Sequence, residues 1–343
     1  MTEERQALRD ALRSLLATTS TRSATGTAAG YDTGLWARLC KEIGVAGLAV
    51  PEAYGGSGAG LAETCIVLEE LGRRLTPSPM LGTFWAAQAL LRAGSTEACA
   101  RLLPTMCTGE RIATLAWDTA AATTTVAGNL LTGRIAPVLD LATADTFLVP
   151  VGTELYEVDG TAPGVTRHDL TPLDPTRRLG ELRLADAPAR HLGTVPLDDL
   201  RDLACVALSA EQVGAAAQAL LVTVDYVQIR EQFGRPIGTF QALQHRLSEA
   251  HVRLEAARSA SYAAIDALVS GAAEAPDRAA VAKVTCSETL QANAAEMVQM
   301  HGGIAITWEH DAHLYVRRAW SSHQLFGTPA SHIARLSAHV LSS

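Results

Sequence analysis

Two short segments in the last third of the chain carry residues suited to holding a ligand. The first reads Arg-Glu-Gln-Phe-Gly-Arg-Pro-Ile-Gly-Thr-Phe-Gln from Arg230 to Gln241, and the second reads Gln-Met-His-Gly-Gly from Gln299 to Gly303. The guanidinium of Arg230 is a two-pronged donor that matches a phosphate. Glycine lets the backbone approach a ligand closely. The alternative is a surface loop in which Arg230 is structural, and each segment alone is a weak signal.

Together, and in this order, the two segments resemble the FAD-binding signatures of the acyl-CoA dehydrogenase family. The resemblance covers nearly the whole chain and includes Gly44-Val-Ala-Gly-Leu-Ala-Val-Pro-Glu-Ala-Tyr-Gly-Gly, Leu68-Glu-Glu-Leu-Gly-Arg and Asp174-Pro-Thr-Arg-Arg. The chain is most similar to the short actinobacterial-type branch, some of whose members pair as unlike subunits. The resemblance implies FAD bound at subunit interfaces, with contacts from Arg230, Phe233, Gln241, Gln299, Gly302 and Gly303.

The position of the family's catalytic glutamate is occupied by a phenylalanine. In the family this glutamate belongs to a Tyr-Glu-Gly-Thr motif, and counting from Gly303 without a gap places the motif at Leu325-Phe326-Gly327-Thr328. Dehydrogenation of an acyl thioester needs a base within hydrogen-bond reach of the α-proton. Phe326 has no ionisable group, so we expect the chain alone to dehydrogenate ordinary saturated acyl-CoA substrates poorly.

A minority of the family places this glutamate on an earlier helix, where this chain has Ala204 followed by Cys205. Glu211 lies seven residues further on, on the same helix face and about 10 Å along the axis. It is the candidate catalytic residue that remains. We prefer to interpret Glu211 as a solvated or subunit-interface carboxylate, and Cys205 as a buried structural thiol rather than a nucleophile.

Other sequence features are weaker evidence for a functional site. The family's Thr-Glu-Pro…Gly-Ser-Asp segment, which contacts the flavin ring, aligns with Trp117-Asp-Thr-Ala-Ala-Ala-Thr, which lacks the proline and the Gly-Ser-Asp. Trp117 is either a stacking partner for a flavin or, more commonly for tryptophan, part of the core. His310 and His313 are three residues apart, but no third ligand set has metal spacing, so we predict no metal site.

The composition narrows the class of protein. The chain has 343 residues, 48% of them hydrophobic and 19% charged, which is typical of a globular protein of about two domains. Its net charge of −8 argues against a nucleic-acid partner. We expect no signal peptide and no window apolar enough to span a membrane. The six scattered cysteines indicate reduced, mostly buried thiols in a cytoplasmic protein.

Hydrophobic periodicity predicts an α+β fold in three domains. Residues 1–115 form an N-terminal helical domain, 116–195 an antiparallel β domain, and 196–343 a C-terminal four-helix bundle. One long helix is expected from the apolar spacing between Phe240 and Leu268. A second is expected to bury the apolar face formed by Val281, Val284, Ala292, Ala295 and Val298. Asp277 is expected to cap its start, and Gly302-Gly303 to end it.

Three functions remain open. The first is an FAD-dependent α,β-dehydrogenation of an acyl thioester, carried by CoA or a carrier protein, in a homo-oligomer or only within a mixed oligomer. The second is a catalytically incomplete subunit that completes the FAD site of a partner. The third is a flavin-dependent oxygenase or a non-redox enzyme on the same fold.

Overall fold

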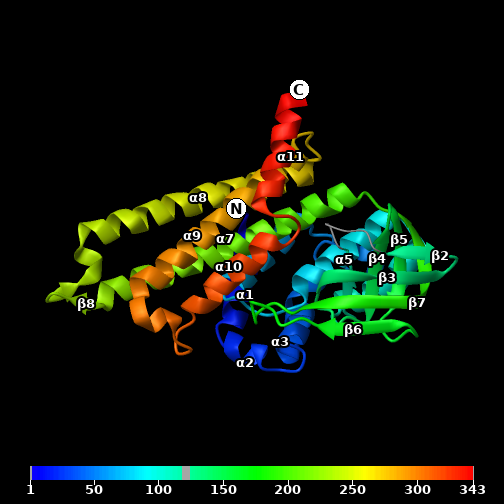
Figure 1. Cartoon of the computed structure of the whole chain (residues 1–343), viewed down its shortest axis with the longest axis horizontal. Coiled ribbons are helices and arrows are strands. Elements are labelled where there is room, and N and C mark those ends of the chain that lie inside the picture. Colours follow the sequence, from blue (N-terminus) through cyan, green and yellow to red (C-terminus); the bar gives the residue numbers. More distant parts are fainter. Residues whose placement is uncertain (1, 118–123, 343) are drawn as a thin grey trace. The chain divides into compact units, whose positions relative to one another are not determined.

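The computed structural model describes residues 2–117 and 124–342, which divide into two compact units. The first unit comprises Met1–Val67 and Pro77–Ala204, and the second comprises Leu68–Thr76 and Cys205–Ser343. The boundaries of the three domains that we expect from the sequence remain a prediction. The chain nevertheless follows the predicted order of helices, a sheet and long helices (Figure 1).

The first unit opens with helices of moderate length. They are α1 (Glu3–Leu16), α2 (Thr21–Thr25), α3 (Thr33–Arg38), α4 (Leu61–Arg73), α5 (Met80–Ala93) and α6 (Thr96–Cys107). Side-chain caps begin several of them: the Asp32 carboxylate accepts from the Leu35 amide at 2.9 Å, for example. Glycines with positive φ, such as Gly94 after α5, end others. Short helical turns lie at Leu39–Ile43, Val45–Gly47 and Glu52–Tyr54.

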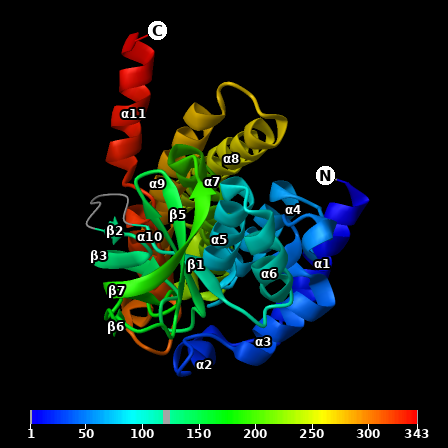
Figure 2. The ribbon, with the colours of Figure 1, turned by 90° about the vertical axis from the view of Figure 1, so that its right-hand side faces the viewer.

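Strands of this unit form one seven-stranded sheet. They are β1 (Ala113–Leu115), β2 (Thr125–Ala127), β3 (Leu130–Leu139), β4 (Thr146–Val151), β5 (Glu154–Asp159), β6 (Val165–Asp169) and β7 (Leu179–Thr194). Their order is β1-β4-β5-β7-β3-β2, with β6 also paired to β7. Helix α5 lies against β1 and β7, as Figure 2 shows.

The strands β2 to β7, within the predicted domain of residues 116–195, pair antiparallel as expected, and the short strand β1 before that range makes the sheet mixed. Ala113 to Leu115 of β1 pair in parallel with Thr146 to Leu148 of β4. The other pairings in the sheet are antiparallel. Strand β1 follows α6 closely and is only three residues long, so its sequence reads as the end of the helical segment.

Long helices dominate the second unit. They are α7 (Leu197–Ile229), which begins in the first unit, α8 (Gln241–Ser270), α9 (Ala275–His301), α10 (Ala312–Gln324) and α11 (Pro329–Ser342). A hairpin of β8 (Glu231–Gln232) and β9 (Arg235–Pro236) joins α7 to α8 through a turn at Ile237–Thr239, and the short helix η5 (Gly302–Ile306) follows α9. Helices α8, α9 and α10 run side by side (Figure 1).

Helix α7 is long enough and apolar enough to cross a membrane, by length and composition alone, contrary to expectation. Of its most apolar window, 83% is buried inside the protein. Its side chains belong to the core of the bundle, together with those of α8, α9 and α10. The hydropathy of α7 is therefore that of a central core helix.

Helix α9 buries a different face from the one we predict. Its buried residues include Lys283, Cys286, Leu290 and Asn293, whereas Val281 is 40% exposed. The rest of the predicted apolar stripe is half-buried or exposed. The cap is also different, because Glu274 precedes the helix without a side-chain bond and Asp277 pairs with His339. The helix does end at Gly302, as expected.

Candidate functional site

A tight hairpin carries the first of the two predicted cofactor-binding segments. Phe233 and Gly234 form its two-residue turn with φ of 54° and 77°, a conformation that matches the twist of the flanking strands. The Ile237 amide donates to the Arg230 carbonyl at 2.7 Å and closes its base. Phe233 is 92% exposed at the tip. The hairpin therefore presents an aromatic ring to whatever lies beside the chain.

The rest of this segment is also accessible. Arg230, directly after α7, is exposed and forms no ion pair with a described residue. Its neighbour Arg235 lies over the Phe240 ring, 4.2 Å from the centroid, while Gln241 is exposed at the start of α8. A cation without a protein counter-charge next to exposed aromatic and amide groups fits a nucleotide diphosphate.

The second segment lies close to the first. Tyr226, one helical turn before Arg230, stacks on His301 with ring centroids 4.2 Å apart. Its hydroxyl donates to the His301 carbonyl at 3.4 Å. His301 is followed by Gly302, whose φ of 63° requires glycine, and by Gly303. The structure thus brings the ends of α7 and α9 together.

The space around the glycines of the second segment is open. A Cβ atom added to Gly302 or Gly303 would meet nothing within 4 Å. Gln299, in the last turn of α9, is exposed as well. A ligand could therefore approach the backbone here, and the residues fit the outer half of a dinucleotide such as FAD. No ligand-contacting role is tested for any of these residues, and all six assignments remain predictions.

Phe326 is buried, and the side chains of His332 and Cys205 converge on its carbonyl oxygen. It is 6% exposed, with a φ of 59° that is rare for a bulky residue. His332 Nε2 lies 3.0 Å from the Phe326 carbonyl oxygen, and Cys205 Sγ donates to the same oxygen at 3.7 Å. The position expected for the base is therefore filled by a fixed, unionisable side chain. Cys205 is fully buried, as we predict.

Glu211 is neither solvated nor at a free surface. Its carboxylate accepts a hydrogen bond from Arg318 of α10 at 2.6 Å, and the two side chains are 8% and 4% exposed. Gly72 packs so closely that an added Cβ atom would lie 2.1 Å from the Glu211 carbonyl oxygen. The interpretation as a solvated or interfacial carboxylate is therefore wrong, and the geometry favours a structural ion pair inside the bundle over a base.

Lys283 is a buried cation that the sequence reading missed. Its ammonium donates to the carbonyls of Ser322 and His323 at 2.8 and 3.2 Å, at the C-terminal end of α10, and to the Ser287 hydroxyl at 3.2 Å. Carbonyls in the last turn of a helix attract cations. Lys283 therefore fixes the end of α10, two residues before Phe326. The signal available in the sequence was a charged residue at a position of α9 that is buried.

Trp117 lies beside Trp85, with ring centroids 5.9 Å apart, and is half-buried. Trp85 in turn donates to the Leu200 carbonyl at 2.9 Å. This arrangement favours a packing role for Trp117. The segment that follows, aligned with the family's flavin-ring contacts, falls outside the described residues.

The paired histidines take part in aromatic contacts. His310 lies 4.4 Å from His301 between ring centroids, and His313 meets Trp308 edge-on at 4.7 Å. Within the described ranges, no group of three or more His, Cys, Asp or Glu side chains is arranged to hold a metal ion. Burial, followed by the proximity of His310, lowers the pKa of His301 below its usual value.

Family models match most of the chain. Residues 2–110 match "Acyl-CoA dehydrogenase, N-terminal domain" and residues 203–341 match "Acyl-CoA dehydrogenase, C-terminal domain". Acyl-CoA dehydrogenase IpdE2 of Mycobacterium tuberculosis is 40% identical, over 99% of this chain and 98% of that protein.

Two solved structures are similar over their full lengths. A variant of the Tcur3481-Tcur3483 steroid ACAD superposes with a TM-score of 0.92 and 32% identity, covering 99% of each chain. The ChsE4-ChsE5 complex from Mycobacterium tuberculosis superposes with a TM-score of 0.92 and 27% identity, covering 100% of this chain and 98% of that chain.

Proposed function

Because the chain belongs to the acyl-CoA dehydrogenase family of FAD-dependent oxidoreductases, we propose that it works as one subunit of a mixed oligomer. This oligomer carries out the α,β-dehydrogenation of an acyl thioester. In it, this chain helps to hold FAD and a related subunit supplies the catalytic base. The observation that carries the proposal is the buried, hydrogen-bonded setting of Phe326 at the position of the family's glutamate.

Cofactor binding is assigned to the exposed end of the bundle. Arg230 would neutralise the pyrophosphate, Phe233 and Gln241 would contact the adenosine half, and the backbone at Gly302 and Gly303 would approach the same group. The Arg230 guanidinium, which forms no ion pair with a described residue, and the open space at the two glycines support this assignment. Bound FAD would accept the substrate's β-hydrogen as hydride.

Proton abstraction is assigned to the partner. Glu211 is paired with Arg318 inside the bundle, and Ala204 and Cys205 occupy the alternative position for the base. None of these side chains is an accessible carboxylate. A glutamate of the related subunit would remove the α-proton.

The substrate class follows from the relatives. The solved relative at 32% identity is described as a steroid ACAD, and the ChsE4-ChsE5 structure is described as a complex. We therefore assign a bulky, polycyclic acyl thioester as the substrate class, and an unlike acyl-CoA dehydrogenase as the partner. A flavin-dependent oxygenase is the alternative to be separated by experiment.

The decisive experiment is anaerobic flavin bleaching by a polycyclic acyl-CoA. The chain is purified alone and with a co-expressed acyl-CoA dehydrogenase from the same organism that has glutamate at the position of Phe326. We expect bleaching only in the mixed oligomer, and its loss when that glutamate is changed to glutamine.

Two variants of this chain complete the comparison. Phe326→Glu should restore slow bleaching when the partner's base is absent. Glu211→Gln leaves the Arg318 charge buried and so destabilises the bundle, but the bleaching rate per folded, FAD-loaded mixed oligomer should be unchanged. Rapid bleaching by the chain alone that disappears in Glu211→Gln would refute the proposal. Rapid reoxidation of reduced flavin by oxygen with hydroxylation of the substrate would support the oxygenase instead.

A further inference from the structure

Three aromatic rings lie in contact between the two segments assigned to the cofactor. Tyr226 of α7 stacks on His301 of α9, with 4.2 Å between ring centroids and 22° between ring planes, and His301 lies 4.4 Å from His310. We call these three residues the ring cluster. The Arg230 amide donates to the Tyr226 carbonyl at 2.9 Å, and Gly302 directly follows His301. The ring cluster therefore joins the turn that carries Arg230 to the backbone at Gly302.

Backbone contacts fix the orientation of the two imidazoles. His301 Nδ1 lies 2.7 Å from the Met297 carbonyl oxygen, which can only accept, so this nitrogen carries the proton. His310 Nδ1 accepts from the Ala312 amide at 3.1 Å, so in the neutral ring this nitrogen is the unprotonated one. The Tyr226 hydroxyl donates to the His301 carbonyl at 3.4 Å. Each ring is thus held in one position before any ligand binds.

The contact between His301 and His310 also closes a loop. Residues 302–309 leave the end of α9 and return to it at His310. Within this loop Ala305 is fully buried and belongs to the core of the bundle, whereas Trp308 is 69% exposed. A loop that begins with two glycines has large conformational freedom on its own, so fixing its two ends reduces the entropy that is lost when a ligand binds to it.

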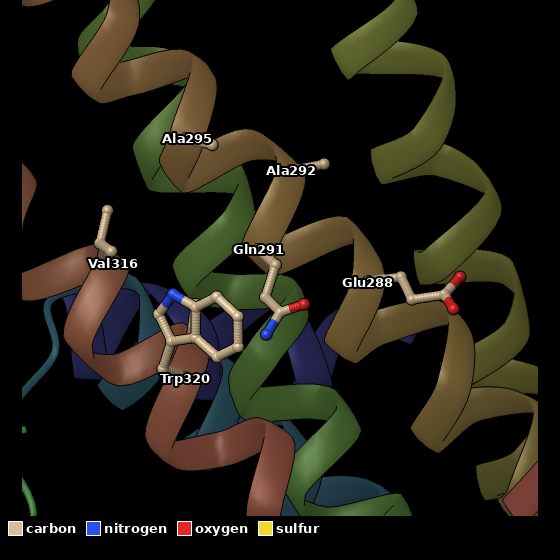
Figure 3. A pocket seen from close by; sticks show the side chains of 7 residues that line it. Glu288, Gln291, Ala292, Ala295, Val316 and Trp320 are labelled. Atoms are coloured by element: carbon tan, nitrogen blue, oxygen red, sulfur yellow. The ribbon is translucent and has the colours of Figure 1, made fainter. Parts of the chain in front are cut away.

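The packing between α9 and α10 is open on one side. A groove of about 400 Å³ lies there, with Ala292 and Ala295 of α9 along it and Val316 and Trp320 projecting from α10 (Figure 3). Small side chains beside a hollow make few van der Waals contacts. The position of the last turn of α9 consequently depends more on the contacts that the ring cluster makes with α7 and with the segment before α10.

We infer that the ring cluster positions the two halves of the cofactor site, with Tyr226 and His301 as the positioning residues. This inference rests on the proposed function, because it takes the FAD pyrophosphate as the group bound by Arg230 and approached by the backbone at Gly302. In this role neither ring contacts the cofactor. Tyr226 fixes the turn that carries Arg230, and His301 fixes the peptide before Gly302. A site whose halves are held in register before binding loses less entropy on binding and therefore binds more tightly.

A double-mutant cycle on FAD affinity tests this inference. FAD is titrated into the mixed oligomer described above, in which this chain is wild type, Tyr226→Ala, His301→Ala or the double variant. Each single variant should weaken FAD binding about three- to ten-fold, the range expected from one aromatic pair. The double variant should bind no more weakly than the single ones, because all three break the same contact. Losses that multiply in the double variant would overturn the inference.

His301→Phe separates positioning from folding. Phenylalanine keeps the stacking on Tyr226 and should retain nearly the wild-type FAD affinity, whereas His301→Ala should not. Thermal midpoints report whether each variant folds. The matched control is Tyr156→Ala, which breaks the edge-on contact between Tyr156 and His191 in the first unit and should leave FAD affinity unchanged. An FAD affinity as low in His301→Phe as in His301→Ala would contradict a positioning role for the ring.

Hydrogen exchange of the full chain without added FAD gives a readout that is independent of the cofactor assignment. Tyr226→Ala and His301→Ala should each accelerate exchange in residues 226–241 and in residues 299–311, but not in the middle of α8. If Arg230→Ala lowers FAD affinity while the ring variants change neither affinity nor exchange, the inference is wrong and the cofactor assignment stands. If no variant changes FAD affinity, Arg230→Ala included, the cofactor assignment fails and the inference fails with it.

Discussion

Arg318 and Glu211, 107 positions apart in the chain, meet inside the helical bundle at 2.6 Å. Their side chains are 4% and 8% exposed, so both charges are withdrawn from water. A buried ion pair gains little over a well-packed apolar pair, but removing one partner strands a charge in the interior. The pair is thus a point of fragility in the bundle.

Removing Arg318 alone should destabilise the protein strongly. We expect Arg318→Leu to lower the free energy of unfolding by about 3–5 kcal/mol, because Glu211 then stays buried without its counter-charge. The measurement is urea unfolding followed by circular dichroism. Replacing both residues with leucine should recover most of the loss. A double variant no more stable than Arg318→Leu would show that the two side chains act independently.

Lys283→Met should loosen the end of α10. The substitution keeps the length of the side chain but removes the donors to Ser322, His323 and Ser287. Leaving buried acceptors unsatisfied costs about 1–3 kcal/mol. Hydrogen exchange should show faster opening in residues 320–328 than in α8. Uniform acceleration across the bundle would contradict a local capping role.

Arg230→Ala should reduce FAD binding while leaving the fold intact. Loss of one charge-assisted contact is worth on the order of 1.5–3 kcal/mol, or roughly ten- to a hundred-fold in affinity. FAD is titrated into the assembled mixed oligomer. Arg230→Lys keeps the charge but loses the two-pronged geometry, so its FAD affinity should lie between those of wild type and Arg230→Ala. FAD content equal to wild type in Arg230→Ala would make the residue purely structural.

Stability should fall as the pH drops below about 6.5, with a contribution from His301. Burial, and then His310, lowers the pKa of His301 from its usual 6.5 in the folded chain. The unfolded chain therefore binds a proton that the folded chain resists, and stability is lost as the pH falls through the unfolded value. Unfolding midpoints from about pH 8 to about pH 5.5 measure the slope.

The variant that tests this pH dependence is His301→Phe. Phenylalanine can still stack on Tyr226 but does not titrate, so its slope should be shallower than that of wild type. An identical slope in wild type and His301→Phe would remove His301 from the explanation.

Much of the fold follows from local pattern. The apolar spacing from Phe240 to Leu268 predicts α8, and Gly302 marks the end of α9. The parallel pairing of β1 with β4 does not follow, because three residues carry too little pattern to reveal a strand. Local sequence also assigns Asp277 to a cap, whereas the folded chain pairs it with His339, 62 positions away.

The site is less accessible to sequence reasoning because its decisive contacts are distant in the chain. Nothing beside Glu211 in the sequence reveals Arg318, and nothing beside Lys283 reveals the end of α10. The stripe from Val281 to Val298 shows a further limit. Periodicity identifies an apolar face but does not say whether the chain itself or a neighbouring subunit covers it.

All six cysteines are free and buried. Burial raises the pKa of Cys40 and Cys286 to about 12 and that of Cys107 to about 11, so these thiols remain protonated and unreactive at neutral pH. The thiols of the native protein should consequently react very slowly with maleimide. A single cysteine introduced on the surface could then be labelled selectively without removing the natural ones. The slower labelling of the six buried thiols would measure the rate at which the fold opens.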